Sequence, residues 1–148
     1  MEITLPISSL VLIALGAIGV SLSIVTGLAL IFNKKVNERS NFIFAVLLIL
    51  SGLTLLNETL ATAGIYNKFK NLYFIPLNFS LAIGPLFFLF IKSKYTRKIS
   101  YLDYAHLLLP VIQFLVFVFV GFRSIAFKSN LWKNEGFRLF LNLSLIHI

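Results

Sequence analysis

Four long stretches of this chain carry no Asp, Glu, Lys or Arg, and this limits the solvent in which it can fold. They are residues 3–32, 40–57, 71–91 and 104–122. An α-helix rises about 1.5 Å per residue, so roughly 20 apolar residues cross the hydrocarbon core of a bilayer, which is about 30 Å thick. Each stretch reaches or approaches that length. The sequence therefore predicts an all-α, polytopic helical membrane bundle in contact with the lipid bilayer.

Composition supports a membrane protein over a soluble one. Hydrophobic residues make up 59% of the chain and charged residues 12%, whereas ordinary soluble domains are about 25% charged. Cysteine is absent, which excludes disulfides, thiolate metal sites and a cysteine nucleophile. The net charge of +8 could indicate nucleic-acid binding, but the basic residues stand between the apolar stretches. That placement is typical of anchors to lipid headgroups.

The expected module covers residues 1–142 and contains four complete spans and the start of a fifth. We place the spans at about 5–32, 41–64, 73–91 and 103–122, with residues 137–141 beginning the fifth. Short connections predict that consecutive spans are antiparallel neighbours. The apolar stretches do not alternate with polar residues, which argues against a β-barrel.

The charges around the first span predict its orientation. The chain opens with Met1-Glu2, which lacks the basic region of a cleavable signal peptide. The first connection carries Lys34, Lys35 and Arg39, and basic residues close to the first span favour the cytoplasmic side. We therefore expect the N-terminus outside.

Small residues and prolines mark candidate contact and hinge positions. Helical spacing places four small residues on one face of the first span, where another helix can approach closely: Gly16, Gly19, Ser23 and Gly27. This face predicts either a homodimer or moving interface, or a static contact within the chain. Proline breaks helical hydrogen bonds, and the candidate hinge residues are Gly84, Pro85 and Pro110.

Three ionisable residues are candidates for sensing or for structure. Glu58 is a carboxylate inside a span, which is costly in lipid and often functional, although its place near the span's end also suits a structural role. Asp103 is a candidate N-cap of the fourth span. His106 can titrate near neutral pH or simply form a structural hydrogen bond. The motifs of catalytic triads, phosphate loops and HExxH metal sites are absent, so we expect no enzyme activity, cofactor or metal.

The last six residues, 143–148, have an unusual sequence. Leu-Ser-Leu-Ile-His-Ile back-translates to CTG TCT CTT ATA CAC ATC, which resembles the transposon end of sequencing-library adapters. We therefore expect this hexapeptide to be an adapter-derived artefact, and the natural protein to continue past Asn142. The alternative is that these residues begin a genuine apolar helix.

Two segments carry a resemblance to a known family. They are Gly84-Pro85-Leu86-Phe87-Phe88-Leu89-Phe90-Ile91-Lys92-Ser93 and Asp103-Tyr104-Ala105-His106-Leu107-Leu108-Leu109-Pro110. Together with the basic connection 33–41, this region resembles the N-terminal membrane region of bacterial AraC-type helix-turn-helix regulators. The resemblance covers about residues 33–122, and it departs at Phe90, where an aromatic hydroxyl is usual.

The resemblance implies a membrane-embedded sensory or anchoring module of a transcriptional regulator in the bacterial inner membrane. DNA would then be contacted only through a C-terminal domain that this fragment lacks, and the ligand stays unknown. Two alternatives remain open: a fragment of a transporter or membrane enzyme, and a small structural membrane protein. The sequence that follows the codon for Asn142 would separate the three.

Overall fold

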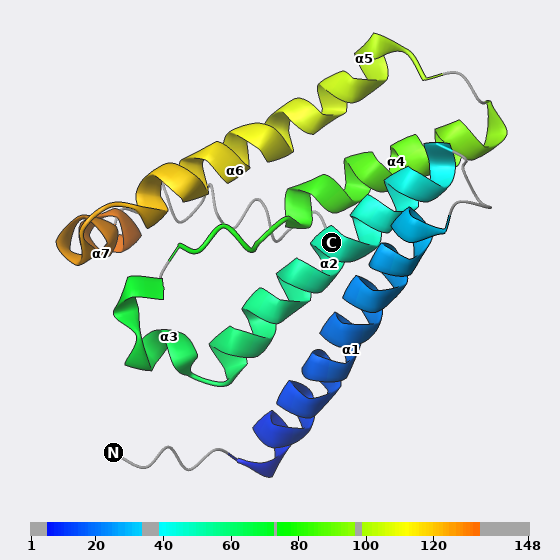
Figure 1. Ribbon diagram of the computed structural model, residues 1–148. Coiled ribbons are helices and arrows are strands. Elements are labelled where there is room, and N and C mark those ends of the chain that lie inside the picture. Colours follow the sequence, from blue (N-terminus) through cyan, green and yellow to red (C-terminus); the bar gives the residue numbers. More distant parts are fainter. Residues whose placement is uncertain (1–5, 34–38, 73, 97–98, 134–148) are drawn as a thin grey trace.

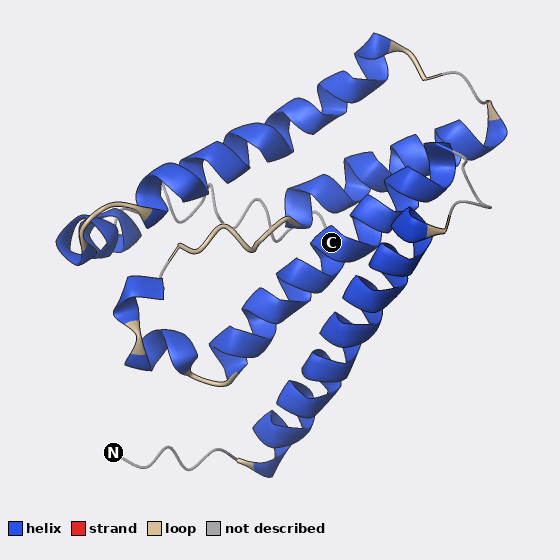
Figure 2. Cartoon of the chain, viewed as in Figure 1, coloured by secondary structure: helices blue, strands red, loops and turns tan. Residues whose placement is uncertain are grey.

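The computed structural model describes residues 6–33, 39–72, 74–96 and 99–133, and all regular secondary structure in these residues is helical (Figures 1 and 2). This confirms the all-α class. The elements, in chain order, are α1 (Ile7–Phe32), α2 (Arg39–Thr62), α3 (Ile65–Lys68), the 3-10 turn η2 (Lys70–Leu72), α4 (Ser80–Tyr95), α5 (Tyr101–Tyr104), the 3-10 turn η3 (Ala105–Leu107), α6 (Leu108–Gly121) and α7 (Ile125–Lys133).

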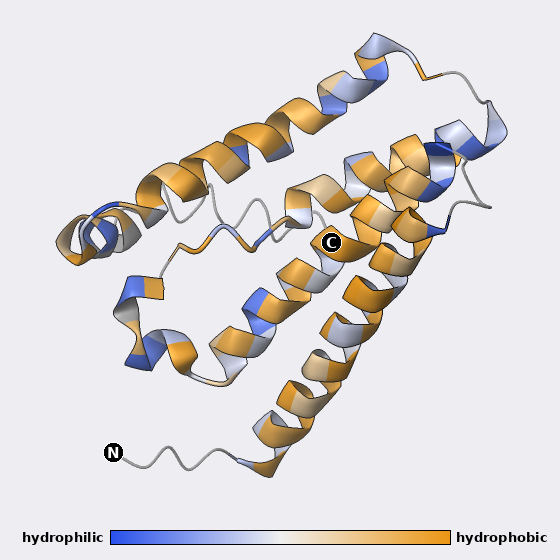
Figure 3. Cartoon of the chain, in the orientation of Figure 1, coloured by the Kyte–Doolittle hydropathy of each residue, from blue (hydrophilic) through white to orange (hydrophobic). Residues whose placement is uncertain are grey.

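Helices α1 and α2 form an antiparallel hairpin (Figure 1). Only Gly16, Val20 and Gly27 of α1 are buried, because α1 contacts the bundle along this narrow stripe. The rest of its surface is apolar and exposed, with residues such as Leu15 and Leu22 more than half accessible. Figure 3 shows this apolar colour along the full length of the helix. Apolar exposure on this scale marks a surface covered by lipid or by another protein.

Helix α2 is central, because α4 packs against its other side in the antiparallel direction. The core of this contact joins the first half of α2 to the stretch of α4 from Ala82 to Leu89. It consists of Ile43, Leu47, Ala82, Leu86 and Leu89. The rings of Phe44 and Phe90 stack beside it, with centroids 4.8 Å apart.

Three helices are long and apolar enough to cross a membrane: α1, α2 and the continuous helix of α5, η3 and α6, which spans Tyr101–Gly121. The expected boundaries 5–32, 41–64 and 103–122 are close to these helices. The expectation of four complete spans is wrong. The third, at 73–91, is replaced by α4, whose 16 residues are about 24 Å long and shorter than a bilayer core of about 30 Å.

The chain between Phe74 and Phe79 explains why α4 starts late. Pro76 lacks an amide hydrogen and disfavours helical geometry at Ile75, and Phe74 has a positive φ of 62°. The Asn78 side chain then accepts a hydrogen bond from the Ser80 amide (3.1 Å), which favours a helix start at Ser80. Irregular backbone at membrane depth is tolerated only where protein satisfies its polar groups.

Two ring contacts join α6 to the segment that precedes α4. Phe79 stacks on Phe114 with ring centroids 5.8 Å apart, and the ring centroids of Phe74 and Phe117 are 6.3 Å apart.

Beyond α6, α7 folds back toward the segment after α3. There the buried Lys128 ammonium donates to the Asn71 carbonyl at 3.0 Å. The expected start of a fifth span at 137–141 and the artefact at 143–148 lie outside the described residues.

Candidate functional site

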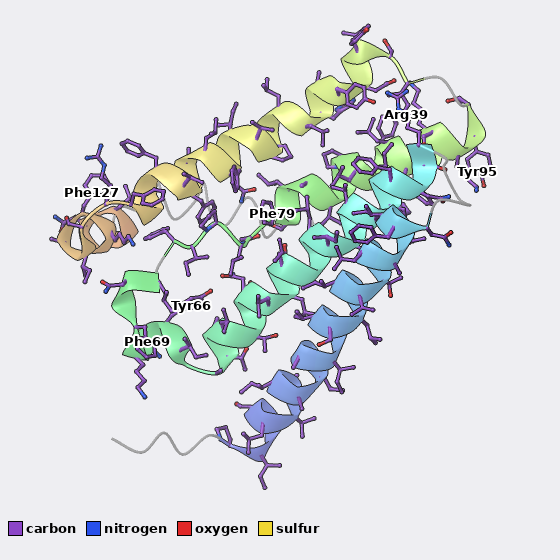
Figure 4. All side chains as sticks on the ribbon, viewed as in Figure 1. Arg39, Tyr66, Phe69, Phe79, Tyr95 and Phe127 are labelled. Carbon is purple, nitrogen blue, oxygen red and sulfur yellow. The ribbon has the colours of Figure 1, made fainter. Side chains whose placement is uncertain are left out.

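Polar side chains gather at the end of the bundle where α2 begins, α4 ends and α5 begins. We call this group the polar corner, and it consists of Arg39, Lys92, Ser100, Asp103 and Tyr104. Figure 4 shows Arg39 and Tyr95 at this end, Tyr66 and Phe69 at the opposite end, and Phe79 between them. The basic connections that follow α1 and α4 leave from the same end as the polar corner.

The centre of the polar corner is a salt bridge between α4 and α5. Lys92 Nζ donates to Asp103 Oδ1 at 2.6 Å, and the Asp103 side chain is only 11% exposed. The Ser100 amide donates to Asp103 Oδ2 at 2.7 Å. One carboxylate therefore neutralises the end of α4 and caps the start of α5, where the positive end of the helix dipole favours a negative charge.

Asp103 was predicted to be the N-cap residue, but it caps the helix from a different position. Ser100 is the N-cap residue, and Asp103 is the third residue of the helix that follows it. From there its side chain reaches back to the N-cap amide, as in a capping box. The partner across the corner is Lys92, which sequence reasoning had assigned only to headgroup anchoring.

A second link joins α2 to α5. The Arg39 guanidinium donates a hydrogen bond to the Tyr104 hydroxyl, and its carbon lies 5.7 Å from the centre of the Tyr104 ring. Both side chains are exposed, so this contact lies at the surface of the polar corner. Together the two links tie the start of the α5–α6 helix to both α2 and α4.

His106 lies beside the polar corner. Its ring meets the edge of Phe88 with centroids 5.4 Å apart, one turn along α4 from Pro85. Lys92 Nζ also lies over Phe88, 5.8 Å from its centroid. Phe88 therefore contacts both His106 and Lys92.

The candidate hinge residues have different surroundings. Pro85 lies inside α4, where it removes the hydrogen bond that its amide would give to Leu81. Gly84 has open space where a side chain would begin. Pro110 is buried in the first turn of α6, and because it cannot bond to His106 the preceding turn tightens into the 3-10 geometry of η3.

Glu58 is exposed in the last turn but one of α2, close to the opposite end of the bundle. Beside it the Tyr66 hydroxyl donates to Asn57 Oδ1 at 2.6 Å. Burial raises the pKa of Tyr66, and the nearby Glu58 carboxylate raises it further. This arrangement braces the turn from α2 into α3, and the described residues give Glu58 no cationic partner among their salt bridges.

The predicted small-residue face of α1 is used within the chain. A Cβ on Gly19 would lie 2.7 Å from Leu55, one on Gly27 would lie 2.6 Å from Ile49, and one on Gly16 would overlap Thr59. Ser23 packs against Gly52, since a Cβ there would be 3.0 Å from the Ser23 Cβ. The face therefore forms the α1–α2 contact within the chain.

Within the described residues no group of three His, Cys, Asp or Glu side chains could hold a metal ion.

The roles of Arg39, Lys92 and Tyr104 were not predicted from the sequence. Many basic and aromatic residues flank these spans, and their spacing alone does not show which of them are partners.

Comparison with protein-family models, with curated proteins and with solved structures finds no match to this chain.

Proposed function

We propose that this chain is the membrane-embedded sensory and anchoring module of an AraC-type transcriptional regulator, with its DNA-binding domain further along the protein. The observation that carries the proposal is the polar corner. It makes the start of the α5–α6 helix dependent on two polar links, whereas the ring contacts further along α6 join it to Phe79 and Phe74, in the segment before α4.

This contrast suits a helix with two arrangements. Interfaces that repack between discrete positions carry signals in many proteins, and a ligand shifts such an equilibrium only if it binds one arrangement better than the other. With the N-terminus outside, the polar corner faces the cytoplasm in the bacterial inner membrane. A shift of α6 would then change the corner on the side where an output domain would lie.

A second candidate is favoured by the broken start of α4. Transporters place binding sites at interrupted helices near the membrane midplane, and α4 begins at Ser80 after an irregular segment. A transporter fragment should continue into further spans that carry paired intramembrane acids. If the chain is instead a small structural protein, the sequence should stop soon after Asn142.

The deciding experiment is to read the genomic sequence downstream of the codon for Asn142 and to test the full-length parent. A helix-turn-helix domain after further spans supports the sensory function, while paired acids or an early stop support the other two. In the parent, Lys92→Ala should change reporter output at unchanged protein level, and Tyr95→Ala, whose side chain is 83% exposed, is the matched control. Equal output from Lys92→Ala and wild type would reject signalling through the polar corner.

A further inference from the structure

Two polar atoms inside the bundle are buried and have no hydrogen-bond partner among the described residues: Ser80 Oγ and Gln113 Nε2. Gln113 is 2% exposed and Ser80 is 7% exposed. Unpaired polar atoms are expensive to bury, and each one in a native structure calls for an explanation, such as a bound molecule.

The register of α6 against α4 directs Gln113 toward the start of α4. The buried face of α6 carries Pro110, Gln113, Phe117 and Val120. Phe117 contacts Phe74, while Pro110 lines the same cavity as Phe79 and Ala82. Gln113 lies between Pro110 and Phe117 on this face, so it is opposite the segment from Phe74 to Ala82. Ser80, the first residue of α4, is in that segment.

Both unpaired groups are hydrogen-bond donors. The Gln113 side-chain amide donates through Nε2, and the Ser80 hydroxyl can donate as well. The N-terminal end of α4 adds a partial positive charge, which favours an anion or another electron-rich acceptor. The nearby Thr54 hydroxyl of α2 is already engaged, because it accepts from the Phe79 amide at 3.0 Å and donates to the Leu50 carbonyl.

An apolar cavity adjoins this donor site. It is a groove that is open to the surroundings of the bundle, has a volume of about 370 Å³ and lies between α2, α4 and α6. Phe79 and Ala82, which line it, lie beside Ser80 in the chain, and Pro110, which also lines it, lies one helical turn before Gln113. The other lining residues are all apolar: Val46, Leu50, Leu86, Leu107, Val111 and Phe114.

We propose that the cavity binds a small amphiphile, with its apolar chain between α2, α4 and α6 and its carboxylate or other acceptor head at Gln113 and Ser80. A medium-chain fatty acid is the simplest molecule with this chemistry. The binding site itself does not depend on the proposed sensory function. The further step, that the bound amphiphile is the signal, rests on that function.

The probe for this site is decanoic acid carrying a photoreactive diazirine near the end of its chain, added to the purified full chain in nanodiscs of zwitterionic lipid. We expect saturable labelling of Val46, Leu50, Leu86 or Val111. Decanoate should compete about tenfold better than decyltrimethylammonium, which has the same chain and a cationic head. Equal competition would show an apolar groove for lipid chains and would overturn the proposal, as would labelling that does not saturate.

Two variants test the head site. Gln113→Leu should weaken binding of the probe about tenfold, and Ser80→Ala should weaken it less, with the helical circular dichroism of both unchanged. Ile112→Leu, on the outward face of α6, is the control. If Gln113→Leu fails to fold, Ser80→Ala alone decides. Wild-type affinity in the folded variants would overturn the proposal.

The signalling step has a separate readout. In the full-length parent, added decanoate should change reporter output, and Gln113→Leu should abolish that response. Binding without any reporter response would leave the site intact and would reject decanoate as the signal. The opposite result is also possible: Lys92→Ala changes reporter output, but decanoate does not bind. That result would reject the binding site and leave the sensory function standing.

Discussion

Several polar residues in this bundle satisfy their hydrogen bonds in one of two ways. Along the helices, hydroxyl groups donate to a backbone carbonyl of the preceding turn, as Thr59 does to Leu55 and Thr62 to Glu58. At the ends, charged side chains reach partners on other elements, as Lys92 and Lys128 do. This division follows from the solvent, because lipid supplies no hydrogen bonds and the charged ends can contact water or headgroups.

At the polar corner, Lys92 and Asp103 should behave as one unit. Asp103→Ala removes both the salt bridge and the bond to the Ser100 amide, so it should destabilise the protein more than Lys92→Ala does. The double variant should lose less stability than the sum of the two single changes, because neighbours in one network couple. Unfolding in increasing SDS measures all three. Strictly additive losses would contradict the pairing.

Tyr66 gives the turn after α2 a dependence on pH. Its pKa is raised by burial and by Glu58, so folding favours the neutral phenol. The stability that this group contributes is complete below the ordinary pKa of tyrosine and is lost as pH rises through the raised pKa. Tyr66→Phe should cost about 1 kcal/mol at neutral pH through the lost bond to Asn57, and its deficit should shrink in alkali. A pH-independent deficit would contradict this.

Among the elements, the α1–α2 hairpin is held by close backbone approach. Gly27 is the tightest position with a rigid neighbour, since a Cβ there would lie 3.0 Å from the Ala45 carbonyl oxygen. At Gly19 the nearest atom is the end of the Leu55 side chain, which can rotate. The backbone contact, and not the small residue alone, therefore sets the cost of a substitution.

Gly27→Leu should therefore destabilise the hairpin by about 1–3 kcal/mol, and Gly19→Leu by less. Leu22→Ala is the control, because Leu22 is 62% exposed on the outward face. Resistance to unfolding in SDS gives the ranking. Equal losses at Gly27 and Leu22 would show that the small face is not the contact.

Helix α4 depends on α2 for the satisfaction of its first amides. Thr54→Val keeps the shape of the side chain but removes the oxygen that accepts from the Phe79 amide, and an unsatisfied buried amide costs about 1–3 kcal/mol. We expect this loss together with faster hydrogen exchange at Phe79 and Ser80. Thr54→Ser should restore both. Thr62→Val is the control, since the Thr62 hydroxyl bonds only within α2, and an equal loss there would contradict the role of Thr54.

Over the whole molecule, the prediction of spans at 5–32, 41–64 and 103–122 matches α1, α2 and the α5–α6 helix to within two residues at each end. The prediction fails for α4, because it was based on the length of an uncharged stretch. Pro76 and Asn78 are uncharged, so that length does not show that they delay the start of the helix. The signal was present as a proline followed by an Asn two residues before Ser80. The polar corner was predicted only in part, since Asp103 was identified, while the choice of Lys92 among nearby lysines depends on the angle between α4 and α5.

The orientation of the molecule in the membrane is the last property that can be tested directly. The polar corner and the ends of α1 and α4 lie on one side of the bundle, and α3 lies on the other (Figure 1). The chain has no cysteine, so single cysteines report each side without background. Ser40 is 2% exposed and unsuitable for labelling, whereas Thr96 and Asn67 are exposed on opposite sides.

Because basic residues favour the cytoplasmic side, we expect Asn67→Cys to react with an impermeant maleimide in intact cells. Thr96→Cys should react only after the inner membrane is permeabilised, and Leu22→Cys, at the middle of α1 on its outward apolar face, should react in neither state. The reverse pattern, with Thr96→Cys labelled in intact cells and Asn67→Cys protected, would place the N-terminus inside. The polar corner would then face away from the cytoplasm, and signalling from it to a cytoplasmic DNA-binding domain would be rejected.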